Sequence, residues 1–258
     1  MPALVTGAAK RLGRAMALDL AAQGHDVAVH YAGSAEAAEA TAADIRALGV
    51  RAVTLQADLL DDAATAALLP AAAAALGGPV TVLINNASIF EYDTIETATR
   101  TSWDRHMQSN LRAPFLLTQA MAAQGLEPAA DENGEPQATG LIVNMIDQRV
   151  HKLTPEFMTY TLAKMGLWAF TRTAAQALAP AIRVNAIGPG PTMQGARQSA
   201  DHFAAQRAAT VLQRGADPEG ITAALRYFLD ARAVTGQLIC VDGGQHLAWQ
   251  TPDVLGVE

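Results

Sequence analysis

Short apolar runs rich in β-branched residues alternate along this chain with longer, alanine-rich stretches whose apolar residues recur at helical spacing. The predicted strands are residues 3–5, 26–30, 52–56, 80–85, 141–144, 182–187 and 237–241. The predicted helices are residues 12–23, 35–48, 63–76, 103–123, 155–178 and 218–229. Strands that are apolar throughout are covered on both faces. The alternation therefore predicts an α/β fold with a doubly wound parallel sheet of the Rossmann type.

The same alternating pattern runs through nearly all 258 residues, so we expect one domain over 1–258. Two stretches interrupt it. Residues 125–140 are polar and rich in turn formers, which predicts a solvated surface loop. Residues 188–203 follow a strand, and open α/β sheets bind ligands beyond the carboxyl ends of their strands. We therefore expect a substrate-covering flap within 189–215.

Composition excludes several classes of function. Half of the residues are hydrophobic, 17% are charged, and no apolar run has membrane-spanning length, which predicts a soluble protein without a membrane partner. The first strand begins close to Met1 with no secretion signal before it, so we expect a cytoplasmic protein. The net charge of −7 and the lack of a basic stripe argue against nucleic acid as a binding partner. The single cysteine, Cys240, lies in an apolar strand and is expected to be inert, and we expect no metal site.

The first strand leads into a glycine-containing turn, PALVTGAAKRLGRA. Gly7 ends the strand and Gly13 enters the following helix, and bare N–H groups at a helix start bind anions such as a pyrophosphate. Lys10 and Arg11 stand in this turn, although cations are unfavourable at the positive end of a helix dipole unless an anion compensates them. We therefore expect an anionic cofactor at this turn.

TGAAKRLG resembles the phosphate turn of short-chain dehydrogenase/reductases, with Arg11 in place of the middle glycine. Other motifs of that family follow in its order: Asp58 in QADL, the NNA segment 85–87, YxxxK at Tyr160 and Lys164, GPG at 188–190 and VDGG at 241–244. The resemblance covers nearly the whole chain. It implies an NAD(P)-dependent oxidoreductase that acts on a small molecule and assembles as a homotetramer.

The end of the second predicted strand indicates which dinucleotide binds. NAD-specific folds place a carboxylate there for the ribose 2′-hydroxyl, whereas this chain reads VHYAGS. His30, Ser34, Lys10 and Arg11 offer donors or positive charge for a 2′-phosphate, so we expect NADPH. With the resemblance, the expected cofactor-binding residues are Gly7, Lys10, Arg11, Leu12, Gly13, His30, Tyr31, Ser34, Asp58, Leu59, Asn86, Ala87, Ser88, Tyr160, Lys164, Pro189, Gly190 and Thr192.

Tyr160 and Lys164 are four residues apart on a predicted helix and so project from the same face. A nearby ammonium stabilises a phenolate, so we expect Lys164 to lower the pKa of Tyr160, the proton donor. By resemblance Lys164 also holds the nicotinamide ribose, and Asn110 supports the lysine through a bound water. Asn110 inside a helix is equally compatible with a structural kink.

Asp147 stands where ketone-reducing relatives place a serine that donates a hydrogen bond to the substrate carbonyl. An ionised carboxylate only accepts hydrogen bonds, so it would repel the oxygen that gains negative charge. A substrate with N–H donors, or with a ring nitrogen to be protonated, would instead use Asp147 as an acceptor or, if burial raises its pKa, as an acid. We therefore expect reduction of a C=N bond in a nitrogen heterocycle.

Arg11, Asp147 and the segment NNASIF together resemble the pteridine reductase and dihydromonapterin reductase branch. That resemblance implies that Phe90 stacks on a pterin ring, that Ser88 contacts pterin and cofactor, and that Arg11 reaches both the pyrophosphate and the pterin. Tyr160 and Asp147 complete the expected substrate site. Gly33 departs from the branch, whose best-known members carry an arginine there for the 2′-phosphate.

Other interpretations of these residues stay open. Phe90 could be an ordinary core aromatic, and Gln148 and His151 are more often loop residues than substrate contacts. The leading hypothesis is an NADPH-dependent reductase of a dihydropterin or related heterocycle. The alternatives are a general carbonyl or 3-oxoacyl reductase that tolerates Asp147, and a non-catalytic NADP(H)-binding regulatory protein.

Overall fold

The computed structural model describes residues 1–195 and 198–250, which are built around a seven-stranded parallel sheet. The order of the strands is β3-β2-β1-β4-β7-β8-β9, so β1 lies between β2 and β4. The strands are β1 (Pro2–Val5), β2 (Asp26–Tyr31), β3 (Ala52–Gln56), β4 (Val82–Asn85), β7 (Gly140–Met145), β8 (Ile182–Pro189) and β9 (Leu238–Val241). All seven predicted strands are present, which confirms the predicted fold class.

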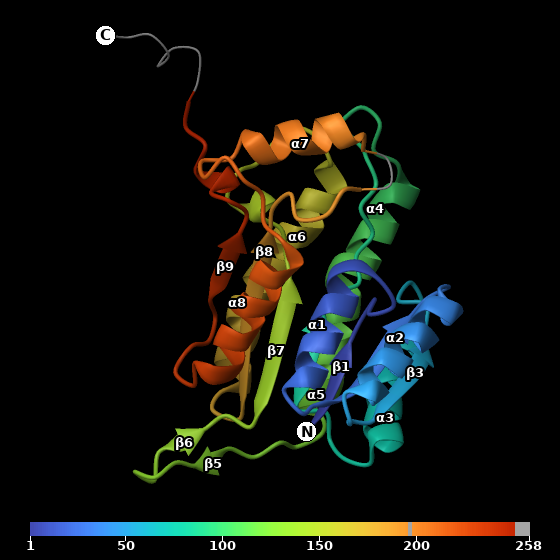
Figure 1. Cartoon of the computed structure of the whole chain (residues 1–258), viewed down its shortest axis with the longest axis vertical. Coiled ribbons are helices and arrows are strands. Elements are labelled where there is room, and N and C mark those ends of the chain that lie inside the picture. Colours follow the sequence, from blue (N-terminus) through green and yellow to red (C-terminus); the bar gives the residue numbers. More distant parts are fainter. Residues whose placement is uncertain (196–197, 251–258) are drawn as a thin grey trace.

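Helices cover both faces of this sheet (Figure 1). On one face α1 (Arg11–Ala22), α2 (Ala35–Ala47) and α8 (Pro218–Asp230) share a core with one set of strand residues. On the other face α3 (Asp62–Leu76), α5 (Ala113–Ala122) and α6 (Met158–Leu178) share a core with the alternate set. No helix in the described ranges is long and apolar enough to span a membrane.

The predicted helix over 103–123 is not continuous. It consists of α4 (Arg100–Met107), a five-residue π-helical segment over Gln108–Arg112, and α5. The π-helical segment contains Asn110, so the regular α-helical pattern is interrupted at this residue. Such single π-turns occur often at functional sites because they change where a helical side chain points.

The structure has regular elements in the two stretches for which the sequence predicted none, residues 125–140 and the expected flap. Residues 125–140 contain a small antiparallel pair, β5 (Ala129–Ala130) with β6 (Pro136–Gln137), because Asp131 closes a tight turn by accepting from the N–H groups of Asn133 and Glu135. The expected flap contains the helix α7 (Ala200–Ala208). Its N-cap is Ser199, whose side chain accepts from the N–H of His202. Residues 196–197 of that flap lie outside the described residues.

The carboxyl ends of the parallel strands share one edge of the sheet, and α7 lies over this edge (Figure 1). The β5–β6 pair lies at the opposite end of the molecule. The motifs predicted from sequence follow β1, β2, β4, β7 and β8, so the sheet brings them together beneath α7.

Candidate active site

Two cavities open at the carboxyl edge of the sheet, and Ser88 lines both. The first, of about 280 Å³, is lined by Arg11, Leu12, Asn86, Ser88, Phe90, Met145, Ile146, Asp147, Tyr160, Lys164, Pro189 and Gly190. The second, of about 350 Å³, is lined by Gly7, His30, Ala32, Asp58, Leu59, Leu60, Ala87, Ser88, Ile89, Arg105 and Ser109. The first cavity thus joins the predicted catalytic and substrate-binding residues, apart from Asn110, with the middle of the predicted cofactor site.

The turn after β1 brings the backbone unusually close to the start of α1. A Cβ atom on Gly13 would lie 2.3 Å from the carbonyl oxygen of Gly7, so no larger residue fits there without a shift. Arg11 has φ +56°, a left-handed conformation that favours glycine. Its guanidinium donates to the carbonyl oxygens of Gln194 (2.8 Å) and Met193 (3.0 Å), and so joins this turn to the segment after β8.

His30 is buried behind this turn, and both ring nitrogens are used there. Its Nδ1 accepts the N–H of Gly7 (3.0 Å), so Nε2 carries the proton and donates to the carbonyl of Ala57 (3.1 Å). Burial lowers the pKa of His30 and keeps the ring neutral. The expectation that His30 offers a donor or positive charge to a 2′-phosphate is therefore wrong: His30 lines the second cavity and fixes the conformation of Gly7.

The remaining residues expected at the adenosine end lie around the ends of β2 and β3. Tyr31 is the last residue of β2, Ser34 is the N-cap of α2 without a side-chain capping bond, and Lys10 is exposed at the N-cap of α1. Asp58 accepts the N–H of Leu60 and, with Leu59, lines the second cavity. Lys10, Tyr31 and Ser34 are not among the residues that line the second cavity.

Tyr160 and Asp147 form a hydrogen-bonded pair in the first cavity, in which Tyr160 is buried and Asp147 is half-buried. The Tyr160 hydroxyl donates to Oδ2 of Asp147 (3.0 Å), and Oδ1 of Asp147 accepts the N–H of Arg149 (2.8 Å) as the N-cap of a short 3₁₀ turn. Lys164, one turn further along α6, donates to the carbonyl of Met145 (2.7 Å), and its Nζ lies 5.6 Å from the centre of the Tyr160 ring. The three side chains form one constellation.

Burial shifts the pKa of all three groups. It raises the pKa of Asp147, and it raises the pKa of Tyr160, to which the Asp147 charge also contributes. It lowers the pKa of Lys164 to about 8, although Asp147 opposes this shift. The expected lowering of the Tyr160 pKa by Lys164 is therefore wrong here, because burial and the adjacent carboxylate favour the neutral phenol.

Asn110 does not contact Lys164 directly. Its side chain accepts the N–H of Ile89 (2.9 Å) and donates to the carbonyl of Ile89 (2.8 Å), so it holds the backbone between Ser88 and Phe90. Asn86 is similarly occupied, since its Nδ2 donates to the carbonyl of Thr6 (2.8 Å). Both amides hold the loop after β4 through bonds to its backbone or to that of the turn after β1.

Phe90 is 45% exposed, so it is not a core aromatic. Its ring stacks on Phe157 with 4.3 Å between centroids and meets Tyr160 edge-on at 4.7 Å. Arg149 lies 5.1 Å from the centre of the Phe157 ring. Phe157 has φ +54°, a strained conformation for a bulky residue. The sequence analysis missed Phe157, because only its left-handed conformation at the N-cap of α6 brings it to Phe90.

A buried polar network behind Tyr160 was also missed. His106 on α4 accepts the N–H of Glu91 at Nε2 (3.1 Å), so its Nδ1 donates to the hydroxyl of Thr159 (2.7 Å). That hydroxyl donates to Asp93 (2.5 Å), which also accepts the N–H of Thr159 (3.1 Å). Burial lowers the pKa of His106. The network ties the loop carrying Phe90 to the start of α6, but its members are far apart in sequence and follow no motif.

The segment after β8 closes the first cavity. Pro189 and Gly190 line it, and Thr192 is buried, with its hydroxyl donating to the carbonyl of Gly190 (3.0 Å).

Gln148 is buried and His151 is exposed outside the cavity, where its ring lies 5.6 Å from that of His246. Cys240 is half-buried in β9, and burial raises the pKa of its thiol to about 12, which agrees with an inert cysteine.

Residues 2–204 match the family described as short chain dehydrogenase. The chain belongs to this family of oxidoreductases. Among curated members, the 3-oxoacyl-[acyl-carrier-protein] reductase FabG of Staphylococcus epidermidis is 31% identical over 250 residues, which are 95% of this chain and 98% of that protein.

Solved structures of short-chain dehydrogenases superpose closely on this chain. FolM alternative dihydrofolate reductase 1 from Brucella suis, solved in complex with NADP, has a TM-score of 0.89 and 45% sequence identity, and the match covers 98% of each chain. A short-chain dehydrogenase from Burkholderia cenocepacia, also in complex with NADP, has a TM-score of 0.84 and 32% identity over 95% of this chain and 97% of that chain. Both of these similar proteins were solved with NADP bound.

Proposed function

We propose that this short-chain dehydrogenase is an NADPH-dependent reductase of a dihydropterin or a related nitrogen heterocycle. The observation that carries the proposal is the half-buried Asp147 carboxylate, which accepts the Tyr160 hydroxyl inside the cavity that Arg11 and Phe90 also line. The 45% identity with FolM alternative dihydrofolate reductase 1 over 98% of the chain supports the same reaction class.

The residues present fit NADPH. The two cavities meet at Ser88 and together extend from the ends of β2 and β3 to the ends of β7 and β8, which suits a dinucleotide bound across the strand edge. The Gly7–Gly13 approach leaves the N–H groups of α1 open to a pyrophosphate, and the first turn of α1 has no acidic residue. Lys10, Tyr31 and Ser34 would surround a 2′-phosphate, where no carboxylate stands at the end of β2.

When bound, NADPH supplies a hydride. Tyr160 holds a proton at its hydroxyl, because burial and Asp147 raise its pKa, and Asp147 can itself hold a proton more readily than an exposed aspartate. Together they can deliver a proton to a ring nitrogen as the adjacent carbon is reduced. Lys164 would bind the ribose next to the nicotinamide. Arg11 would bind the pyrophosphate and the substrate oxygen in place of its present partners, the carbonyls of Met193 and Gln194.

The competing function is reduction of a 3-oxoacyl thioester or another ketone, which the similarity to FabG supports. Asp147 argues against it, because a carboxylate placed beside the reacting oxygen disfavours the negative charge that develops there. A third possibility is a protein that binds NADP(H) without turnover.

A substrate panel followed by NADPH absorbance separates these functions. We expect rapid NADPH oxidation with dihydropterins or dihydrofolate and none with ketones or 3-oxoacyl thioesters. Oxidation with 3-oxoacyl thioesters alone would establish the competing function. Tight NADPH binding without oxidation by any substrate would establish the third.

Phe90 provides a test of substrate stacking. We expect Phe90→Ala to raise the KM for a dihydropterin about 10-fold, since stacking on an aromatic side chain contributes about 1–3 kcal/mol per base. The dissociation constant of NADPH should stay unchanged. The matched control is Tyr92→Ala, which removes an aromatic ring that packs on Phe157 but does not line the cavity. Equal effects of the two substitutions on KM would contradict direct stacking on Phe90.

The lowered pKa of Lys164 gives a pH prediction. A lysine is charged below its pKa and neutral above it, so the ammonium is lost as the pH rises through about 8. We expect kcat/KM to fall above this pH. Because Asp147 raises the pKa of Lys164, Asp147→Asn should move the fall to lower pH. A profile that stays flat well above pH 8 would show that the charge of Lys164 is not required.

We also propose a cytoplasmic homotetramer. Trp103, Phe115 and Leu162 are exposed apolar residues on α4, α5 and α6, and a hollow of about 730 Å³ lies between these helices. An apolar surface of this kind is typical of an interface between copies. The molar mass of the purified protein in solution tests the assembly.

A further inference from the structure

The expected flap, residues 189–215, begins at the end of β8 and ends just before α8, and its two ends are in contact. A Cβ atom on Gly215 would lie 2.3 Å from the carbonyl oxygen of Pro191, so the outgoing and returning segments are in contact at this point. Pro191 directly follows Pro189 and Gly190, which line the first cavity, and it precedes the buried Thr192. The position of this contact therefore determines where the wall of the proposed nicotinamide site lies.

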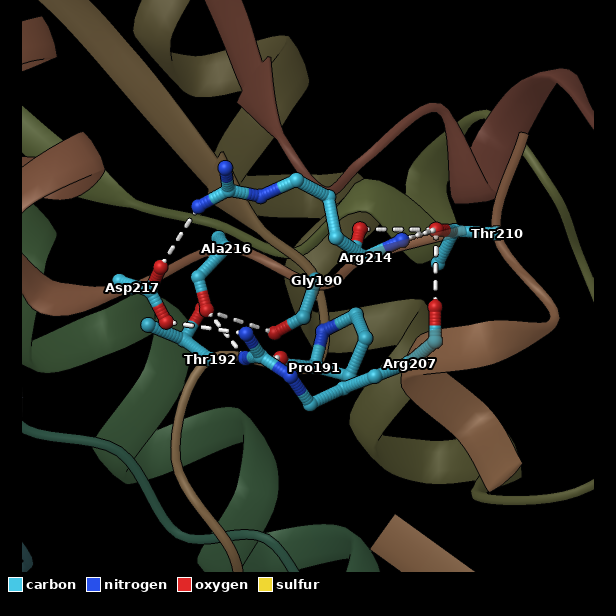
Figure 2. A network of polar contacts seen from close by, with 8 residues as sticks. All are labelled: Gly190, Pro191, Thr192, Arg207, Thr210, Arg214, Ala216 and Asp217. Carbon is cyan, nitrogen blue, oxygen red and sulfur yellow. Dashed lines mark hydrogen bonds and ion pairs between the residues drawn. The ribbon is translucent and has the colours of Figure 1, made fainter. Parts of the chain in front are cut away.

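One side chain fastens the two ends together. Arg207, on α7, donates through Nη1 to the carbonyls of Pro191 (3.0 Å) and Ala216 (2.5 Å), and through Nη2 to Oδ1 of Asp217 (2.9 Å). Figure 2 shows its guanidinium between these three acceptors. Arg207 thus links the flap helix, the segment after β8 and the start of α8.

Asp217 is the N-cap of α8, yet its side chain makes no capping bond. One carboxylate oxygen accepts from Arg207 and the other from Arg214 (2.8 Å), as Figure 2 shows. These arginines hold the pKa of Asp217 below its usual value, with the Arg207 hydrogen bond as the largest cause. A carboxylate at an N-cap normally accepts backbone N–H groups of its own helix. The Asp217 carboxylate instead binds two arginines of the flap.

The backbone that carries Arg207 is itself held. The hydroxyl of Thr210 lies 3.0 Å from the carbonyl oxygen of Arg207 and 2.8 Å from that of Arg214, and it accepts the N–H of Arg214 (3.1 Å). Leu212 donates its N–H to the carbonyl of Gly243 in the turn after β9 (2.9 Å). The base of the flap is therefore joined to the ends of β8 and β9.

We propose that Arg207 is a positioning residue for the nicotinamide half of the cofactor site. It fixes Pro191, and through Pro191 the adjoining Gly190 and Thr192, while leaving the adenosine half unaffected. The inference rests on the proposed NADPH site. The two halves are well separated, because β8 and β2 are four strand spacings apart in the sheet, roughly 19 Å.

The test compares two ligands on the same variants. We expect Arg207→Met to weaken NADPH binding about 10-fold or more, because charged hydrogen bonds that order the binding wall are lost. Adenosine 2′,5′-bisphosphate, which fills only the adenosine half, should bind as it does to the wild type. Arg207→Lys keeps the charge but not the forked geometry, so it should recover part of the NADPH affinity.

Arg214→Met is the matched control. It removes the other arginine from the same Asp217 carboxylate, but the Arg214 side chain is 68% exposed and does not reach Pro191. We expect it to leave both affinities unchanged.

Equal weakening of both ligands by Arg207→Met, or no weakening of either, would overturn the inference. If Arg207→Met does not fold, the affinities for NADPH and for adenosine 2′,5′-bisphosphate are compared in Arg207→Lys and Asp217→Asn instead. A wild-type protein that does not bind NADPH would instead refute the proposed function.

Discussion

Tyr160→Phe is expected to lower kcat for a dihydropterin about 10²- to 10⁴-fold, the usual contribution of a positioned proton donor. The phenol keeps its proton in the folded protein because burial and Asp147 raise its pKa, so the hydroxyl is ready to donate. Phenylalanine retains the ring that packs against Phe90 and removes only the hydroxyl. The measurement is the single-turnover rate with saturating NADPH.

The affinity for NADPH should be retained in this variant. Tyr227→Phe, which removes an exposed hydroxyl on α8 remote from both cavities, should behave as the wild type. A Tyr160→Phe rate within 10-fold of wild type would mean that another group supplies the proton.

Asp147→Ser is expected to exchange one activity for another. We expect kcat/KM for a dihydropterin to fall about 10²-fold or more, because the substrate loses a group that can accept its N–H or hold the proton for a ring nitrogen. Serine replaces an acceptor by a hydroxyl donor, so turnover of ketones should rise. Serine is also a good N-cap, so the short turn after Asp147 should persist.

Asp147→Asn separates charge from shape. The amide keeps the size of the side chain and an acceptor oxygen but cannot hold the proton, so dihydropterin reduction should fall. Its N–H₂ group is a donor, so any gain in ketone turnover should resemble that of Asp147→Ser. If Asp147→Ser gains ketone turnover without losing dihydropterin reduction, the carboxylate has no role in the proposed reaction.

Most of the fold could be predicted because it follows local periodicity. Each strand is a short apolar run bounded by turn residues, and the sheet order then places the motifs after β1, β4, β7 and β8 at one edge. The helix α7 was not predicted, since it has no buried residue and therefore no apolar stripe. The π-helical segment at Asn110 was not predicted, and the hydrogen bond of Asn110 with Ile89, 21 residues away, follows no local sequence pattern.

The candidate site could be predicted where motif and chemistry coincide, as at Asp147 and Tyr160, which the structure brings to 3.0 Å. It could not be predicted where a role depends on distant partners. His30 was assigned to a phosphate because its contacts with Gly7 and Ala57 follow no sequence pattern. Arg11 lines the first cavity, but its hydrogen bonds to the carbonyls of Met193 and Gln194, more than 180 residues away, also follow no sequence pattern.

The most direct test of the central claim is the ratio of kcat/KM for a dihydropterin to kcat/KM for a 3-oxoacyl thioester, measured with NADPH on the wild-type enzyme. The hydrogen-bonded pair of Asp147 and Tyr160 predicts a ratio far above one, because the carboxylate supports protonation of a ring nitrogen and opposes an oxyanion. A ratio below one would contradict the account and assign the chain to ketone reduction.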